Sequence, residues 1–189
     1  VYVVANGAAA QLAQLPEAQG ALVSLDPDDG AIVSLVGGFD YFENKFNRVT
    51  QARRQPGSGF KPFLYSAALE HGFTPASIIM DAPIIADDRD AEQAWRPENA
   101  GGGFSGPMRF REALVRSRNL VSIRLLRGVG PGETIDYAAR FGFDPKQLPR
   151  NETLALGTLS ATPLQVATGY ATFANGGYLI KPYFLDRIE

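Results

Sequence analysis

The residues Pro56-Gly57-Ser58-Gly59-Phe60-Lys61-Pro62 run directly into Phe63-Leu64-Tyr65-Ser66-Ala67-Ala68-Leu69-Glu70, a stretch that indicates a helix. Pro62 lacks an N–H and is compatible only with the first helical turn, so we expect the helix to begin within about one residue of Ser58. Gly72 suits its C-terminal cap. Ser58 and Lys61, three residues apart, therefore project from one face near a helix N-terminus.

This arrangement is suited to nucleophilic chemistry at Ser58. The helix N-terminus favours negative charge developing on the serine oxygen. A neutral Lys61 amine accepts the hydroxyl proton if burial lowers the lysine pKa from about 10.4. The alternative for so short a pattern is an N-capping serine beside a solvated lysine. His71, the only histidine, follows the helix end without an aspartate pattern, and we expect it to be a surface or capping residue.

Composition restricts the other function classes. The 189 residues, 45% of them hydrophobic, can bury the core of one compact domain or most of one. A net charge of -2 argues against nucleic-acid binding. The absence of cysteine, together with a single histidine, leaves no spacing for a metal site, and we expect neither metal nor cofactor. No run of about 18 apolar residues and no charged leader occur, so we expect no spanning helix, signal peptide or membrane contact in this segment.

Upstream of Ser58 the sequence predicts strands. Val1–Val4 indicates a short strand, and the Ala- and Gln-rich residues Ala5–Gly20 indicate a helical piece or linker. The apolar runs Ala21–Leu25 and Ala31–Val36 flank Asp26-Pro27-Asp28-Asp29-Gly30, whose Pro and Gly predict a β-hairpin turn rather than a calcium loop.

Between this hairpin and Ser58, and beyond the first helix, the patterns are mixed. We expect the aromatic residues Phe39, Tyr41, Phe42 and Phe46 to be core. The Pro-, Gly- and Asp-rich stretch Thr74–Gly106, which contains Trp95, indicates a long ordered loop. Helices are expected at about 108–117, 120–127 and 133–141. A last helix is predicted by a capping box, with Thr162 as N-cap, Pro163 next and Gln165 three residues after the cap, and it should end near Asn175.

A second polar motif, Ser117-Arg118-Asn119, follows the first of these later helices. Ser-x-x-Lys followed by Ser-x-Asn and a Lys-Thr-Gly strand is the signature of penicillin-binding proteins and related β-lactamases. Neither Lys-Thr-Gly nor Lys-Ser-Gly occurs in the 189 residues, and Lys181 is followed by Pro182. The first two motifs are present and the third is absent.

The chain resembles the transpeptidase domain of a class A, bifunctional penicillin-binding protein over nearly all of its length. The stretches that carry the resemblance beyond the two motifs occur in the family's order: Gly20-Ala21-Leu22-Val23-Ser24-Leu25-Asp26-Pro27, Val36-Gly37-Gly38, Phe46-Asn47-Arg48-Val49-Thr50-Gln51-Ala52, Arg111-Glu112-Ala113-Leu114, Ala155-Leu156-Gly157, Thr162-Pro163-Leu164 and Phe173-Ala174-Asn175-Gly176-Gly177.

The resemblance implies a fold and a setting. The fold is the α/β (α+β) serine penicillin-recognising, β-lactamase/transpeptidase-like fold, an antiparallel sheet with surrounding helices, incomplete in this chain. Residues 1–19 would be a linker or the edge of a preceding domain, and residues 20–189 the N-terminal part of the transpeptidase domain. The third-motif strand and a glycosyltransferase domain would belong to the remainder of the same protein, on the periplasmic side of the cytoplasmic membrane. The alternative is a truncated domain that has lost turnover.

The resemblance also implies roles. Ser58 would attack a D-Ala-D-Ala stem peptide of peptidoglycan and form an acyl-enzyme that an amine of a neighbouring stem resolves, and β-lactams would acylate the same oxygen. Lys61 would be the acylation base, Ser117 would pass a proton to the leaving amine, and Asn119 would bind the substrate amide and hold Lys61. Trp95 would be a substrate wall, or else packing under the loop. The alternatives are a D,D-carboxypeptidase or β-lactamase of the same superfamily, for which no deacylating Glu can be assigned, and a non-catalytic penicillin-binding sensor or structural module.

Overall fold

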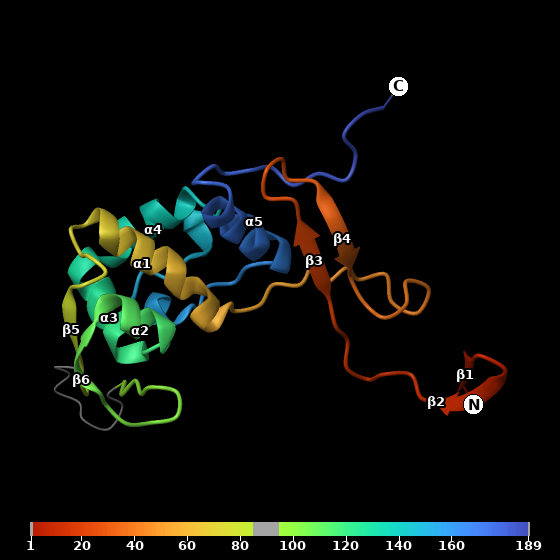
Figure 1. Cartoon of the computed structure of the whole chain (residues 1–189), viewed down its shortest axis with the longest axis horizontal. Coiled ribbons are helices and arrows are strands. Elements are labelled where there is room, and N and C mark those ends of the chain that lie inside the picture. Colours follow the sequence, from red (N-terminus) through yellow and green to blue (C-terminus); the bar gives the residue numbers. More distant parts are fainter. Residues whose placement is uncertain (1, 85–94, 189) are drawn as a thin grey trace.

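The structure is a computed structural model that describes residues 2–84 and 95–188. Within these ranges it contains three separate two-stranded antiparallel sheets and a group of helices (Figure 1). The strands are β1 (Tyr2–Asn6), β2 (Ala9–Ala13), β3 (Leu22–Leu25), β4 (Ile32–Val36), β5 (Ile78–Asp81) and β6 (Gly106–Arg109). The α-helices are α1 (Lys61–Glu70), α2 (Phe110–Val115), α3 (Asn119–Val129), α4 (Pro131–Ala139) and α5 (Pro163–Ala174), with 3₁₀ turns η1 (Gly57–Phe60), η2 (Pro145–Gln147) and η3 (Glu152–Leu156).

Helix α1 lies at the centre of the core and contacts α3, α4 and η3. It is apolar nearly all round, as a helix surrounded by other elements must be. Phe63, which is 1% exposed, packs against Phe141 and Phe143 with ring centroids 5.0 and 4.9 Å apart. The centre of the helical body is therefore the helix that follows Ser58.

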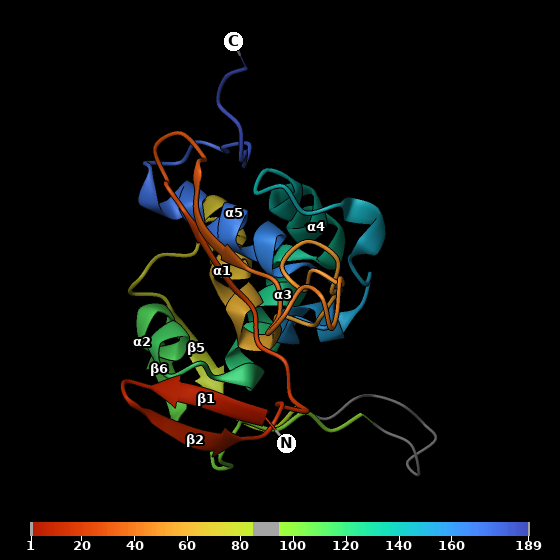
Figure 2. The same cartoon turned by 90° about the vertical axis from the view of Figure 1, so that its right-hand side faces the viewer.

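The hairpin β3–β4 lies against α5, on the side away from α4 (Figures 1 and 2). Its turn is the predicted segment 26–30, in which Gly30 has a φ of 90°. The Nδ2 of Asn175, at the end of α5, donates a 3.0 Å hydrogen bond to the Pro27 carbonyl. The capping box at the start of α5 is also confirmed, because Thr162 Oγ1 accepts from the Gln165 N–H while Gln165 Oε1 accepts from the Thr162 N–H. These two ends fix α5 between the hairpin and the helical body.

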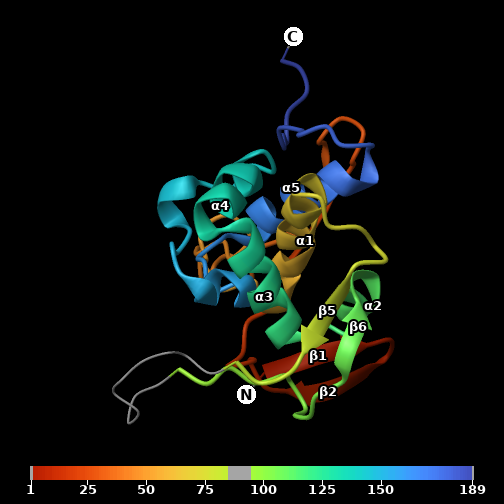
Figure 3. The same ribbon diagram turned by 90° about the vertical axis from the view of Figure 1, so that its left-hand side faces the viewer.

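A loop was expected over 74–106 and a helix from about 108, and both predictions are wrong where two strands form, since the helix α2 begins only at Phe110. Ile78–Asp81 pairs with Gly106–Arg109 as β5 and β6, next to α2 and α3 (Figure 3). The alternation of buried and exposed residues in β5 is too short to stand out in the sequence, and its partner strand contains Pro107. Residues 85–94 lie outside the described residues.

The helical piece expected within Ala5–Gly20 is also wrong. Tyr2–Asn6 and Ala9–Ala13 form the exposed hairpin β1–β2, which stands apart from the helices in Figure 1. The chain reverses in the two-residue turn Gly7-Ala8, between the paired residues Asn6 and Ala9, and Gly7 has a φ of 62°, which glycine adopts without strain. Both strands are almost entirely exposed, so no neighbouring element offers a surface against which a helix of these residues could pack.

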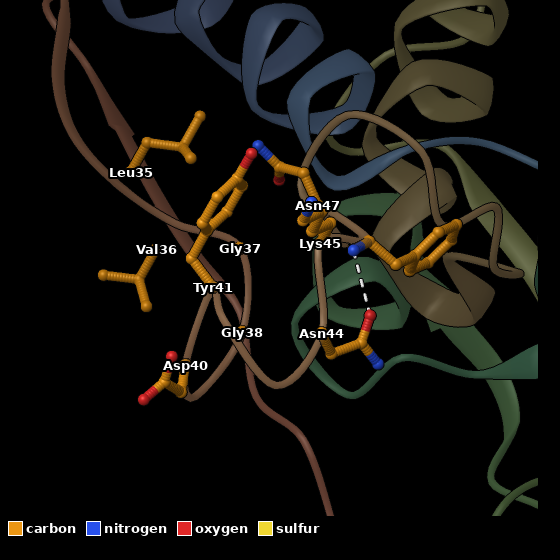
Figure 4. A pocket seen from close by; sticks show the side chains of 10 residues that line it. Leu35, Val36, Gly37, Gly38, Asp40, Tyr41, Asn44, Lys45 and Asn47 are labelled. Carbon is orange, nitrogen blue, oxygen red and sulfur yellow. Dashed lines mark hydrogen bonds between the residues drawn. The ribbon is translucent and has the colours of Figure 1, made fainter.

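The aromatic segment between β4 and Ser58 is not core, contrary to expectation. Phe39, Tyr41 and Phe42 are 60%, 66% and 91% exposed. They belong to a loop held by its polar groups, such as Asn44 Oδ1, which accepts from the Phe46 N–H at 2.9 Å (Figure 4). This loop and the end of β4 line a pocket of about 330 Å³. Hydrophobicity predicted burial here, whereas local hydrogen bonds determine the loop's shape.

Candidate active site

Ser58 lies in the first turn of the helical segment that begins at Gly57 and continues into α1. The predicted start is confirmed, because Pro62 occupies one of the first two positions of α1 and the Lys61 N–H donates to the Ser58 carbonyl. The Ser58 side chain is exposed, and its hydroxyl has no hydrogen-bond partner among the described residues. Its N–H, in a first helical turn, has no intrahelical acceptor. Ser58 thus presents an oxygen and a helix N-terminus to solvent.

Two glycines hold the backbone just before Ser58. Gly57 has a φ of 55° and Gly157 a φ of 68°, and the Gly57 N–H donates to the Gly157 carbonyl at 3.2 Å. A Cβ on Gly157 would lie 2.0 Å from the Gly57 oxygen. Only glycine at position 157 permits this backbone approach, and the approach positions the residue that precedes Ser58.

Lys61 is buried, with 1% of its surface exposed. Its Nζ donates to three acceptors: the Ser117 carbonyl at 2.6 Å, Ser117 Oγ at 3.0 Å and Asn119 Oδ1 at 2.7 Å. No carboxylate of the described residues forms an ion pair with it. Burial therefore lowers the pKa of Lys61 from 10.5 to about 8. An amine with this pKa is able to take up and release a proton near neutral pH.

Ser117 and Asn119 flank the turn that enters α3. Ser117 is the one non-glycine residue of the described ranges with positive φ, at 52°. This conformation directs both its carbonyl oxygen and its hydroxyl to Lys61. Asn119 Nδ2 donates to the Glu98 carbonyl at 2.8 Å, which fixes the carboxamide with its oxygen toward Lys61. One Nδ2 hydrogen of Asn119 is left for another acceptor.

The structure thus joins Lys61, Ser117 and Asn119 in one hydrogen-bonded cluster, with Ser58 one helical turn before Lys61. Trp95 is 37% exposed and makes no hydrogen bond or ring contact with the described residues, so its substrate role stays a prediction. His71 is confirmed as a capping residue, since it ends α1 and its Nδ1 lies 2.9 Å from the Ala67 carbonyl oxygen.

Sequence reasoning missed two residues of this cluster, Asp81 and Asn99. Asn99 Oδ1 accepts from the Asn119 N–H at 2.9 Å, and Asn99 Nδ2 donates to Asp81 Oδ1 at 2.8 Å. Both lie in the stretch expected to be loop, without a spacing that links them to the motifs. In a segment this rich in polar residues, the sequence does not show which of them are buried. The structure shows that Asp81 and Asn99 are, where β5 ends beside α3.

Comparison with known proteins identifies the class of protein to which this fold belongs. Residues 20–189 match the family described as penicillin binding protein transpeptidase domain, and the chain belongs to that family. The resemblance seen in the sequence is therefore confirmed.

Individual relatives point to one branch of the family. The chain is 55% identical over 176 residues to penicillin-binding protein 1A of Pseudomonas aeruginosa, an alignment that covers 93% of this chain and 21% of that protein. The crystal structure of penicillin-binding protein 1A from Haemophilus influenzae matches with a TM-score of 0.87 and 47% identity, over 92% of this chain and 26% of that one.

A more distant match is the PonA1 protein of Mycobacterium tuberculosis in complex with penicillin V, with a TM-score of 0.75 and 29% identity over 89% of this chain and 48% of that one. The expected fold class is confirmed: an incomplete α/β penicillin-recognising fold with small antiparallel sheets and helices. The chain spans about a fifth to a quarter of the length of the 1A-type relatives. No helix among the described residues is long and apolar enough to cross a membrane.

Proposed function

We propose that this chain supplies the acylating half of a peptidoglycan D,D-transpeptidase site, with Ser58 as nucleophile and Lys61 as its base. The observation that carries the proposal is the buried Lys61 ammonium held by three neutral acceptors without a carboxylate. A structural lysine at such a site would be expected to have a counter-charge. The absence of one, within the described residues, keeps the amine available for proton transfer.

Acylation is then a proton transfer coupled to attack. As an ammonium, Lys61 has three N–H bonds that match its three acceptors, and on deprotonation it gains a lone pair. The lone pair takes the Ser58 proton as Oγ bonds to the carbonyl carbon of the penultimate D-Ala. Negative charge on the carbonyl oxygen is stabilised by N–H donors, of which the Ser58 N–H at the helix start is one. Such proton transfer is typically worth about 10²- to 10⁴-fold in rate.

The leaving group needs a proton, and Ser117 is placed to deliver it. Its hydroxyl lies 3.0 Å from Lys61 Nζ, so a proton taken from Ser58 can pass through Ser117 to the nitrogen of the departing D-Ala. The C–N bond breaks and the Ser58 ester remains. The free amine of a second stem peptide then attacks the ester, which restores the Ser58 hydroxyl and forms the crosslink. The remaining hydrogen of Asn119 Nδ2 is suited to the substrate amide carbonyl.

We further propose that the chain works within a longer protein. The relatives are several times its length, and the Lys-Thr-Gly strand that completes the family's site is absent from the 189 residues. Residues 20–189 would then be the N-terminal part of the transpeptidase domain, and residues 1–19 a linker or the edge of a preceding domain. Membrane anchoring, the periplasmic location and a glycosyltransferase domain belong to this same proposal.

The experiment that tests the function is product analysis with the full-length protein and D-Ala-D-Ala stem peptides. We expect release of D-Ala together with crosslinked dimers, and neither product with Ser58→Ala. Release of D-Ala without dimers would indicate the carboxypeptidase alternative. Penicillin binding without release of D-Ala would indicate a sensor or structural module, and would contradict transpeptidation.

A further inference from the structure

The turn that holds Lys61 has a costly backbone conformation. Ser117 is a non-glycine residue with a φ of 52°, in the left-handed region that side chains with a Cβ populate rarely. Such a residue persists only where its surroundings determine its conformation. Because two of the three Lys61 acceptors belong to Ser117, whatever holds this turn also sets the geometry of the Lys61 site.

The buried carboxylate of Asp81 contacts this turn directly, through Arg118. Asp81, at the end of β5, is 0% exposed. Its Oδ2 accepts from Arg118 Nε at 2.8 Å and from the Ser105 N–H at 2.9 Å, and lies 2.6 Å from Arg118 Nη2. Burial acts to raise the pKa of Asp81, but hydrogen bonds from Asn99, Arg118 and Ser105 outweigh it and hold the pKa below its ordinary value. Asp81 is thus a carboxylate that fixes the residue following Ser117.

The same carboxylate reaches the turn from the other side through Asn99. Asn99 is 5% exposed, and its Nδ2 donates to Asp81 Oδ1. Its Oδ1 accepts from the first two N–H groups of α3, those of Asn119 at 2.9 Å and Leu120 at 3.3 Å. Arg118, the N-cap residue of α3, makes no side-chain cap. Asn99 therefore caps α3 from a distant segment, and Asp81 holds the capping side chain in place.

We propose that Asp81 is a positioning residue for acyl transfer: by holding Arg118 directly and Asn119 through Asn99, it keeps the acceptors of Lys61 in place. The inference rests on the proposed function of Ser58 and Lys61. Asp81 makes no hydrogen bond to Lys61 or Ser58 among the described residues, so it acts through its partners. All the hydrogen-bond partners of Asp81 are N–H donors. Only a side chain whose two terminal atoms both accept, such as a carboxylate, can therefore bind all of them.

The variant Asp81→Asn tests this, because it preserves shape and places an amide NH₂ against a donor. The full-length protein is mixed with labelled penicillin, and two quantities are measured: the fraction of protein labelled and the first-order acylation rate constant at saturating penicillin. We expect the rate constant to fall on the order of 10- to 100-fold, as displacements of up to about 1 Å at a reacting centre do. A merely structural role lowers the labelled fraction and leaves the rate constant of the folded molecules unchanged.

A second variant and a control make the test independent of folding losses. Arg118→Lys keeps the charge beside Asp81 but not the two-pronged contact, and we expect a several-fold fall in the rate constant. Glu152→Gln removes the Arg127–Glu152 pair, with contacts of 2.5 and 3.0 Å, further along α3 and away from Lys61. This pair is partly exposed and includes neither Lys61 nor any of its acceptors, so we expect an unchanged acylation rate constant.

The possible results distinguish the positioning role of Asp81 from the proposed acylation of Ser58. A wild-type rate constant in Asp81→Asn, or in Arg118→Lys where Asp81→Asn does not fold, overturns the positioning role while penicillin still labels Ser58. A fall in labelled fraction alone overturns it as well. A wild-type protein without an adduct on Ser58 overturns the proposed function and this inference together.

Discussion

Replacing Gly157 by alanine is expected to disable acylation from a position that carries no reactive group. The new Cβ would lie 2.0 Å from the Gly57 oxygen, 2.7 Å from its carbonyl carbon and 2.9 Å from its Cα. Contacts below 3.0 Å essentially do not occur for real Cβ atoms, so the Gly57 backbone must move by about 1 Å. Ser58 is the next residue and moves with it.

The magnitude follows from two separate costs. Misplacing a reacting group by about 1 Å costs on the order of 10²-fold in rate. A side chain at the Gly157 φ of 68° adds about 1–2 kcal/mol of backbone strain to the folded state. We therefore expect a fall of about 10²-fold in the penicillin acylation rate constant and a lower midpoint of thermal unfolding.

The matched control is Gly132→Ala in α4, where a Cβ would meet nothing within 4 Å. Because alanine fits this position and has fewer conformations in the unfolded chain, the change should stabilise by about 0.4–1 kcal/mol and leave acylation unchanged. If Gly157→Ala acylates at the wild-type rate constant while Gly132→Ala behaves as stated, then the close approach of the two glycines does not position Ser58.

Four further predictions concern Lys61, the aromatic core and the start of α5. The acylation rate should rise with pH and level off above about 8, where Lys61 loses its proton; a rate that is flat through this range would exclude the amine as base. Between pH 8 and 10.5 the unfolded chain keeps the Lys61 proton, whereas the folded chain has lost it. The free energy of unfolding should therefore rise with pH over this range, and Lys61→Met should remove that rise. Phe63→Ala should destabilise by about 3–5 kcal/mol in denaturant unfolding, since it empties the centre of the aromatic core, and a loss below about 1 kcal/mol would contradict that packing. Thr162→Ala should cost about 1 kcal/mol through the lost capping box, with an unchanged midpoint as the contrary result.

The sequence predicted the elements whose signals are local. Pro62 places the helix start beside Ser58, Thr162 and Gln165 define the start of α5, and the turn 26–30 defines the hairpin β3–β4. In each case one or two residues restrict the backbone within a single turn. The position of Ser58 one helical turn before Lys61 needed nothing beyond helical spacing.

What could not be predicted depends on contacts between distant segments. The strands β5 and β6 are joined across more than twenty residues, and neither is long or regular enough to indicate a strand alone. Asp81 and Asn99 become meaningful only when this pairing brings them to the start of α3. The predicted burial of the aromatic residues near Tyr41 was wrong for a related reason. Apolar character favours burial, but it does not show whether another part of the protein lies close enough to cover the side chain.

The central claim, that Ser58 is the acylated nucleophile, is tested most directly by mapping the site of a penicillin adduct. The full-length protein is treated with penicillin, digested, and its peptides are weighed by mass spectrometry. We predict one adduct, on Ser58, that is absent from Ser58→Ala and slow to form in Lys61→Ala. An adduct on another residue, or none on correctly folded protein, would contradict the claim.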